Sequence, residues 1–329
     1  LYKTVLTQLE HMGLIHSEHY ATALINAGDV YVNSRELPEA LQYFLRARDL
    51  LVECGLAGDY RMAALNNNIS MVYRDTGEFD KAEQALDIAF RIIRGIPECR
   101  GELATTYINL GELQVRQNKL EMARESFEEA CRMFEEDGGG DVHYSSACAG
   151  LGQVYYLKGQ IPQAIHWLRQ AADQNNPYAQ YRLGKLLLTG AEGVPRDAVA
   201  AIKLLKDSAA QGNQFAQYTL GKLYLLGQEV QVDRKEALRY FAQAAAQGNT
   251  YAQYFIDHQE DFSGAAAGTA ILRMLHQMSR IFRENAAQPA IYAGMQIDKK
   301  RRRRLQEKRK AMGHKADDHE DRGLTQQTQ

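Results

Sequence analysis

Three asparagines recur at almost constant spacing and carry a side chain suited to binding a peptide backbone. Asn26, Asn68 and Asn109 are separated by 42 and then 41 residues, so a repeated structure points all three the same way. The asparagine amide both donates and accepts hydrogen bonds, which matches the amide groups of an extended chain. Each such bond contributes about 0.5–1.5 kcal/mol net, so three alone give modest affinity. Arg74 and Arg116 fall at neighbouring positions and suit a ligand carboxylate.

A strongly basic segment near the end of the chain is the second feature that could do chemistry. Residues 299–310 carry +8 and residues 311–329 carry −2, so the other 298 residues sum to −8 in a chain of net charge −2. Such a segment suits salt-sensitive contacts with nucleic-acid phosphates, but it lacks interleaved aromatic residues for base stacking, and a solvated tail is the alternative. The nine candidate nucleic-acid-binding residues are Lys299, Lys300, Arg301, Arg302, Arg303, Arg304, Lys308, Arg309 and Lys310.

No pattern in the sequence supports catalysis, a cofactor or a metal. A phosphate-binding loop needs Gly-Lys followed by Ser or Thr, whereas Gly184 and Gly221 are each followed by Lys and then Leu. His16 and His19 lack the third and fourth ligands that zinc requires. No Ser-His-Asp, Cys-His or paired-carboxylate arrangement stands out. We therefore expect a protein that is not an enzyme and that uses no cofactor and no metal.

Composition and cysteine usage indicate a cytoplasmic protein with a buried core. The chain has 329 residues, of which 45% are apolar and 24% are charged, which is ordinary for a folded domain. No run of about 18 apolar residues occurs, so we expect no membrane span. Four isolated cysteines without a Cys-x-x-Cys pair predict buried free thiols in a reducing cytosol: Cys54, Cys99, Cys131 and Cys148.

Small residues recur along most of the chain and mark a repeat. Six alanines follow one another at spacings of 42, 41, 41, 37 and 36 residues: Ala40, Ala82, Ala123, Ala164, Ala201 and Ala237. A second small residue precedes each of the first four by twelve positions: Gly28, Ser70, Gly111 and Gly152. Apolar residues at helical spacing flank a turn at 75–77, which predicts two helices per unit. One such hairpin cannot cover its own apolar face, so the units must stack.

The repeated segments resemble two known repeat families. Four of them resemble tetratricopeptide repeats: NAGDVYVNSRELPEALQYFLRA, NISMVYRDTGEFDKAEQALDIA, NLGELQVRQNKLEMARESFEEA and GLGQVYYLKGQIPQAIHWLRQA. Two later segments, NPYAQYRLGKLLLTG and NQFAQYTLGKLYLLG, resemble the shorter Sel-one-like repeats. The resemblance implies an all-α fold, a right-handed α-solenoid of helix-turn-helix repeats. Residues 1–17 match only the second helix of a unit, so we expect the chain to start inside a repeat.

We expect four regions along the chain. They are a tetratricopeptide array over residues 1–175, Sel-one-like repeats over 176–258, a capping helix within 259–287, and a basic, partly disordered tail over 288–329. The strings RMLHQMSRIFREN and IDKKRRRRLQEKRKAMGHKADDHE resemble the C-terminus of mobilisation relaxases from Firmicutes. A relaxase needs a nucleophilic tyrosine and a histidine triad, and no His-hydrophobe-His cluster exists here, so its activity is not carried over. The change of period near residues 164–178 suggests a fusion of two arrays, natural or engineered.

The resemblance to tetratricopeptide repeats predicts where the three asparagines lie in the folded array. In such arrays the first helices line a concave groove, and asparagine at this position can bond the backbone of an extended peptide. We therefore predict a non-catalytic scaffold that binds a protein or an extended peptide through Asn26, Asn67, Asn68, Asn109, Arg74 and Arg116. Two alternative interpretations remain, one for the asparagines and one for the whole chain. The amides satisfy backbone groups between helices, or the chain is an accessory or C-terminal part of a plasmid mobilisation protein that contacts DNA through its basic tail.

Overall fold

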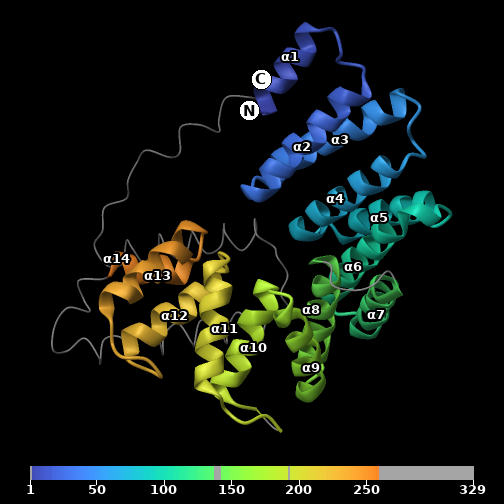
Figure 1. Cartoon of the computed structure of the whole chain (residues 1–329). Coiled ribbons are helices and arrows are strands. Elements are labelled where there is room, and N and C mark those ends of the chain that lie inside the picture. Colours follow the sequence, from blue (N-terminus) through green and yellow to red (C-terminus); the bar gives the residue numbers. More distant parts are fainter. Residues whose placement is uncertain (1, 137–141, 192, 259–329) are drawn as a thin grey trace, which may run out of the picture.

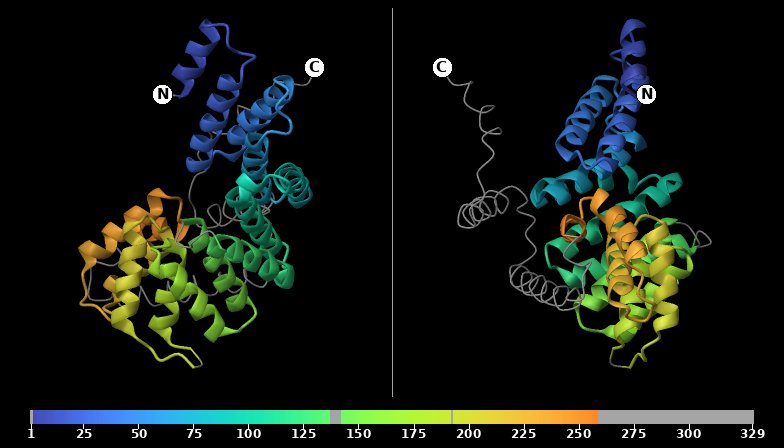
Figure 2. Two further views of the ribbon diagram at one scale, coloured as in Figure 1. Left: turned by 45° about the vertical axis from the view of Figure 1, so that its right-hand side comes forward. Right: turned by 90° about the vertical axis from the view of Figure 1, so that its left-hand side faces the viewer.

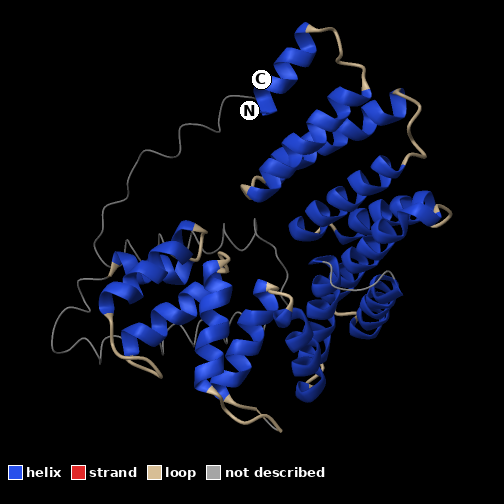
Figure 3. Cartoon of the chain, in the orientation of Figure 1, coloured by secondary structure: helices blue, strands red, loops and turns tan. Residues whose placement is uncertain are grey.

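A computed structural model describes residues 2–136, 142–191 and 193–258 (Figure 1). In these ranges the structure is α-helical and contains no β-strand (Figure 3). The first half contains α1 (Tyr2–His11), α2 (Glu18–Asn33), α3 (Leu37–Glu53), α4 (Tyr60–Thr76), α5 (Phe79–Ile93), the short 3-10 helix η1 (Pro97–Cys99), α6 (Arg100–Arg116) and α7 (Leu120–Glu136). The second half contains α8 (Val142–Leu157), α9 (Ile161–Asp173), α10 (Pro177–Thr189), α11 (Ala198–Ala210), α12 (Gln214–Leu226), α13 (Arg234–Ala246) and α14 (Thr250–Asp257).

The helices pair into antiparallel hairpins that stack in chain order. Each first helix packs on the second helix of its own unit, in the pairs α2–α3, α4–α5, α6–α7, α8–α9, α10–α11 and α12–α13. Helix α1 packs on α2, and α14 packs on α13. The stack follows an arc from α1 through α9 to α14 (Figure 1). The predicted all-α solenoid of helix-turn-helix repeats is confirmed.

The turns inside the long units share one backbone geometry. The predicted turn at 75–77 is present, and Gly77 ends α4 with φ +84°. The equivalent residues Arg35, Asn118 and Gly159 also have positive φ, between +59° and +75°. This left-handed conformation ends a helix cleanly and is easiest for glycine or asparagine. In the short units asparagine begins each first helix instead, as where Asn176 accepts the Ala179 N–H at 3.0 Å.

The core of each unit lies where its two helices cross. All six alanines that mark the repeat are fully buried. They face a small residue on the first helix, which we call the crossing residue: Gly28, Ser70, Gly111, Gly152, Gly184 and Gly221 in successive units. A Cβ atom at Gly28 would lie 2.4 Å from the Phe44 ring, and one at Gly221 would lie 2.7 Å from the Phe241 ring. In these two units the crossing residue is therefore small because an aromatic ring of the second helix occupies that space, whereas at Gly152 and Gly184 a leucine of the second helix, Leu168 or Leu205, occupies it.

Polar contacts add to the apolar packing within and between the short units. Gln211 donates to Gln180 at 2.8 Å, and Gln247 repeats the contact one unit later by donating to Gln217 at 2.8 Å. The loops 190–197 and 227–233, which are longer than the turns of the long units, are joined by an ion pair between Arg196 and Glu229. The two glutamine contacts thus join the two helices of one unit, and the ion pair joins neighbouring units.

Several sequence expectations concern features beside the helical stack. Cys99, Cys131 and Cys148 are buried free thiols as predicted, whereas Cys54 is only partly buried. No described helix is long and apolar enough to cross a membrane. Two expected regions lie outside the described residues: the capping helix at 259–287, and the basic tail at 288–329 with all nine of its candidate residues.

Candidate functional site

The predicted site residues lie on the surface formed by the first helices. We call the surface of α2, α4, α6, α8, α10 and α12 the inner face. Neighbouring first helices contact one another from α2 to α10, whereas neighbouring second helices such as α3 and α5 have no comparable contact in the described ranges. Because the first helices from α2 to α10 approach each other more closely, the stack bends toward them there, and Figure 2 shows the curved stack from two further sides.

One residue per unit stands two positions before the crossing residue and reaches the inner face. In the first three units this residue is Asn26, Asn68 or Asn109, and the three range from exposed to half-buried. The Asn68 amide donates to Asp29 on α2 at 3.0 Å, and burial raises the pKa of the Asp29 carboxyl. The side chains of Asn26 and Asn109 have no hydrogen-bond partner among the described residues. Two of the three amides therefore keep both donor and acceptor available.

Asn67 has a different environment from its neighbour Asn68. Its side chain is 6% exposed, and its amide nitrogen donates to Thr106 on α6 at 2.9 Å. The side-chain oxygen of Asn67 is buried without a hydrogen-bond partner in the described part of the chain. The structure thus uses the Asn67 amide to join the first helices α4 and α6 through a side-chain hydroxyl.

Arg74 and Arg116 lie on the inner face beside carboxylates of the chain itself. The Arg74 side chain is 10% exposed, donates to Asp75 at 3.0 Å and forms an ion pair with Glu112 on α6. Arg116 is more exposed and lies 3.8 Å from Asp75. A ligand carboxylate at either arginine would compete with Asp75 and Glu112, so this part of the inner face is internally charge-compensated.

Sequence reasoning missed the basic residues of the inner face in the short units. Arg182 stands two positions before the crossing residue Gly184, at the same register position as the asparagines. Lys185 and Lys222 each follow the crossing residue of their unit by one position. In the sequence the series of asparagines ends at the fourth unit, because Gly150 occupies the equivalent position there. Extending the register past that glycine would have found Arg182, whereas the two lysines were considered only as parts of a phosphate-binding loop.

Tyrosines surround these three cations. The Arg182 guanidinium lies 4.9 Å from the ring centre of Tyr156 and 5.4 Å from that of Tyr178, and its Nε donates to the Tyr178 hydroxyl at 2.9 Å. The ammonium groups of Lys185 and Lys222 lie 5.9 Å and 5.8 Å from the ring centres of Tyr181 and Tyr218, respectively. Cation–π contacts of this kind orient a cation without neutralising it.

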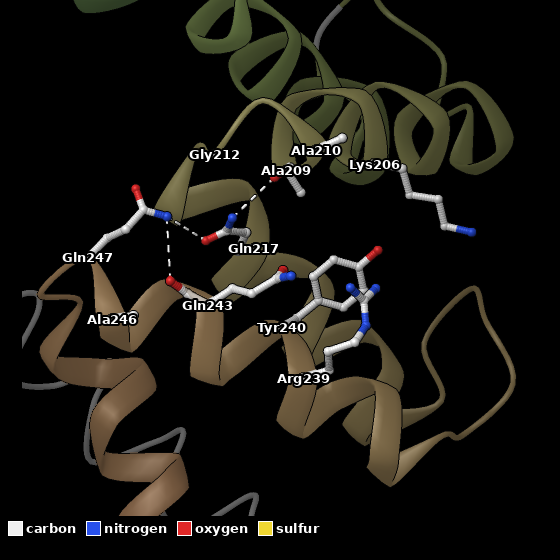
Figure 4. Close-up of a pocket in the computed structure, with 10 residues that line it drawn as sticks. All are labelled: Lys206, Ala209, Ala210, Gly212, Gln217, Arg239, Tyr240, Gln243, Ala246 and Gln247. Atoms are coloured by element: carbon white, nitrogen blue, oxygen red, sulfur yellow. Dashed lines mark hydrogen bonds between the residues drawn. The ribbon is translucent and has the colours of Figure 1, made fainter.

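A pocket of about 430 Å³ lies between the second helices α11 and α13 (Figure 4). Its lining holds the amides of Gln217 and Gln247, which bond each other at 2.8 Å. Arg239 at its rim is paired with Glu236. The polar groups of the pocket thus satisfy one another, and the described residues contain no group of His, Cys, Asp and Glu that could hold a metal ion. This pocket links units and presents no reactive constellation.

Comparison with protein families finds the same two repeat types. Residues 61–136 match the model of the tetratricopeptide repeat, and residues 145–176, 177–213 and 214–249 match that of the Sel1 repeat. The Sel1 match thus begins in the fourth unit, which the sequence analysis grouped with the tetratricopeptide repeats. No curated protein matches the chain.

Two solved structures illustrate what the chain is similar to. A Sel1 repeat protein from Oxalobacter formigenes is 36% identical over 36% of this chain and 89% of that chain, with a TM-score of 0.32. The Rap conjugation gene regulator of the plasmid pLS20, solved in complex with the Phr* peptide, is 17% identical over 86% of this chain and 79% of that chain, with a TM-score of 0.56. The chain is therefore a helical-repeat protein in which tetratricopeptide repeats over residues 61–136 precede Sel1 repeats over residues 145–249.

Proposed function

We propose that the chain is a non-catalytic scaffold that binds an extended segment of a protein partner on its inner face. Repeat architectures of this kind typically mediate protein–protein interactions, and their stacked first helices form extended binding surfaces. The observation that carries the proposal is the pair of unpartnered amides at Asn26 and Asn109, which share one register position on the inner face of the described residues.

Two further features agree with a peptide ligand. The unpartnered amides of Asn26 and Asn109 lie on two separate first helices, α2 and α6, which suits a long ligand that is bound through its backbone. The Rap regulator, which has a similar fold over most of this chain, was solved with a bound peptide. That likeness supports a peptide ligand and leaves its sequence open.

The test begins with twelve-residue peptides selected from a random displayed library on the full wild-type chain. Their affinity is then measured for the double variant Asn26→Ala, Asn109→Ala. Loss of two backbone hydrogen bonds weakens binding about 10- to 100-fold. The matched control replaces Gln42 and Gln84, exposed amides on the second helices α3 and α5, with Ala, and leaves affinity unchanged. Equal affinity of the wild type and the asparagine variant would refute the proposal.

The basic segment at 299–310 motivates a second candidate, contact with DNA phosphates. It rests on the charge of +8 in that segment and on the expectation that such binding is sequence-independent and weakened by salt. A gel shift with a random DNA duplex, with and without residues 299–329, decides it. Binding at low salt that disappears with the tail supports this function, and no shift in the full chain rejects it.

A further inference from the structure

The register of the inner face continues through the whole stack, but its charge changes sign. At the position one residue after the crossing residue, the long units carry Asp29 and Glu112, whereas the short units carry Lys185 and Lys222. The position three residues earlier adds Arg182 to the basic end. Three cations therefore lie on two neighbouring first helices, α10 and α12.

No acid on these helices compensates the three cations. The sequences of α8, α10 and α12 contain neither Asp nor Glu. Arg182, Lys185 and Lys222 form no ion pair with any described residue, in contrast to Arg74, which pairs with Asp75 and Glu112. The long units thus satisfy their own charges on the inner face, and the short units do not.

The environment of the lysines shows that their charges are close together and partly withdrawn from water. Although solvent reaches Lys185, burial and then the Arg182 charge lower its pKa. Burial and then the Lys185 charge lower the pKa of Lys222. Each lysine thus lies near another cation, so a bound anion would relieve repulsion as well as gain attraction.

Aromatic contacts fix these cations relative to one another. Tyr181 on α10 stacks with Phe215 on α12 at 5.8 Å between ring centres, and Tyr218 on α12 lies 6.1 Å from Tyr251 on α14. The same tyrosines, Tyr181 and Tyr218, lie beneath the lysine ammonium groups. The basic end of the inner face is therefore held in place before any ligand arrives, which lowers the entropy cost of binding.

We propose that α10 and α12 bind an acidic stretch of the partner peptide, through Arg182, Lys185 and Lys222. This inference rests on the proposed function, and it adds the charge of the ligand and the orientation of the peptide along the stack. The acidic stretch lies across the short units, and the rest of the peptide runs toward Asn109 and Asn26. A peptide is favoured over a nucleic acid because Asp29 and Glu112 lie on the same inner face and the first 298 residues carry −8, which repels a continuous phosphate backbone.

The experiment measures fluorescence anisotropy of labelled probes on the full chain. The probes are a twelve-residue peptide that alternates Glu and Ser, its counterpart that alternates Gln and Ser, and a twelve-nucleotide single-stranded oligothymidine. Both the wild type and the variants also carry Arg301→Gln, Arg302→Gln, Arg303→Gln and Arg304→Gln, so that the basic tail does not compete. We expect the Glu-Ser peptide to bind about tenfold more tightly than the Gln-Ser peptide, with an affinity that falls as salt rises.

Two pairs of lysine variants that remove the same charge test whether the Glu-Ser peptide binds at α10 and α12. Lys185→Gln with Lys222→Gln weakens binding of the Glu-Ser peptide about tenfold and leaves the Gln-Ser peptide unchanged. The control pair Lys203→Gln with Lys235→Gln removes the same charge from exposed positions on the second helices α11 and α13 and has little effect. Thermal unfolding followed by circular dichroism verifies that both variants fold.

Three results overturn the inference. They are equal binding of the two peptides, equal losses in the two lysine pairs, and tighter binding of oligothymidine that depends on Lys185 and Lys222. Failure of the proposed function is distinct from these, because library peptides would then bind equally well to the wild type and to the variant Asn26→Ala, Asn109→Ala. If library peptides require Asn26 and Asn109 but ignore Lys185 and Lys222, the inner face binds peptides and the acidic preference is wrong.

Discussion

A single register position on the first helices carries amides at one end of the molecule and a guanidinium at the other. Asn26 and Asn109 present unpartnered amides within the described residues, whereas Arg182 presents a charge held by Tyr156 and Tyr178. Amides recognise the backbone of any peptide, and cations select for acidic side chains. The identity of one residue per unit therefore sets whether that part of the surface contributes general affinity or selectivity.

The charge of Asp59 is predicted to stabilise the fold in a pH-dependent way. Its carboxylate accepts the Arg61 backbone N–H at 2.9 Å and pairs with the Arg61 side chain at 2.9 Å. Hydrogen bonds from that side chain hold the pKa of Asp59 below its ordinary value of 3.8. Because the pKa is lower in the folded state, the stabilisation is present above about pH 4 and is lost as pH falls through the lowered pKa.

Asp59→Asn isolates this contribution, since asparagine caps a helix as well as aspartate does. We expect the variant to lose about 0.5–1 kcal/mol of unfolding free energy at pH 7, and the difference from the wild type to narrow at pH 3. Urea unfolding at both pH values measures it. Asp173→Asn, an exposed position at the end of α9, serves as the control and stays within about 0.5 kcal/mol of the wild type. A difference that persists unchanged at pH 3 would contradict the explanation.

For the candidate site residues of the inner face, the sequence predicted the register positions better than it predicted the hydrogen-bond and ion-pair partners. Equal spacing correctly placed Asn26, Asn68 and Asn109 at one register position. It did not reveal that Asn67 bonds Thr106 or that Arg74 pairs with Glu112, because each partner lies in the next unit, 39 or 38 residues away. A periodic pattern shows which residues face the same way, but the distance between neighbouring helices decides which of them satisfy each other.

At the scale of the helices, the crossing residue sets how closely two helices pack. Gly111 on α6 lies against Phe127 of α7, and Gly150 on α8 faces the same ring. One aromatic side chain thus fills the space between three helices of two neighbouring units. The recurrence of small residues at a fixed distance from the alanine marker therefore predicted the helix pairs correctly, because close crossing and stacking need the same residue at the same place in each unit.

Gly111→Ala is predicted to destabilise the protein by overpacking this crossing. The added Cβ would lie 2.8 Å from the Phe127 ring, and relieving that clash costs about 1–3 kcal/mol. The control is Gly101→Ala on the same helix, where a Cβ meets nothing within 4 Å. We expect that change to be neutral or stabilising by up to about 1 kcal/mol. Equal shifts in urea-unfolding free energy for the two variants would contradict this account of the crossing residue.

At the scale of the whole molecule, the units form a nearly one-dimensional stack. Contacts join each unit mainly to its immediate neighbours, so stability is expected to be a sum of unit and interface contributions. The sequence predicted this arrangement from the period alone. It could not show the change from a charge-compensated surface in the long units to an uncompensated basic surface in the short units, because that contrast depends on which acids lie within reach of each cation.

Local damage at one end of the stack is predicted to stay local. Phe241→Ala removes a fully buried ring from α13, and Phe44→Ala removes its equivalent from α3. Hydrogen exchange measured by mass spectrometry should show faster exchange in α12–α14 for the first variant and in α2–α4 for the second, because distant units share no contacts. Faster exchange through the entire described stack in either variant would show a single cooperative unit instead.

The central claim, that the inner face binds an extended peptide, is tested most directly by photo-crosslinking. A library-selected peptide carries benzoylphenylalanine at each position in turn, and mass spectrometry identifies the residues to which it crosslinks on the full chain. The account predicts crosslinks on the first helices that carry the proposed contacts, namely α2, α6, α10 and α12, advancing from one to the next as the photoreactive residue moves along the peptide. Crosslinks confined to the second helices, or scattered without order, would contradict it.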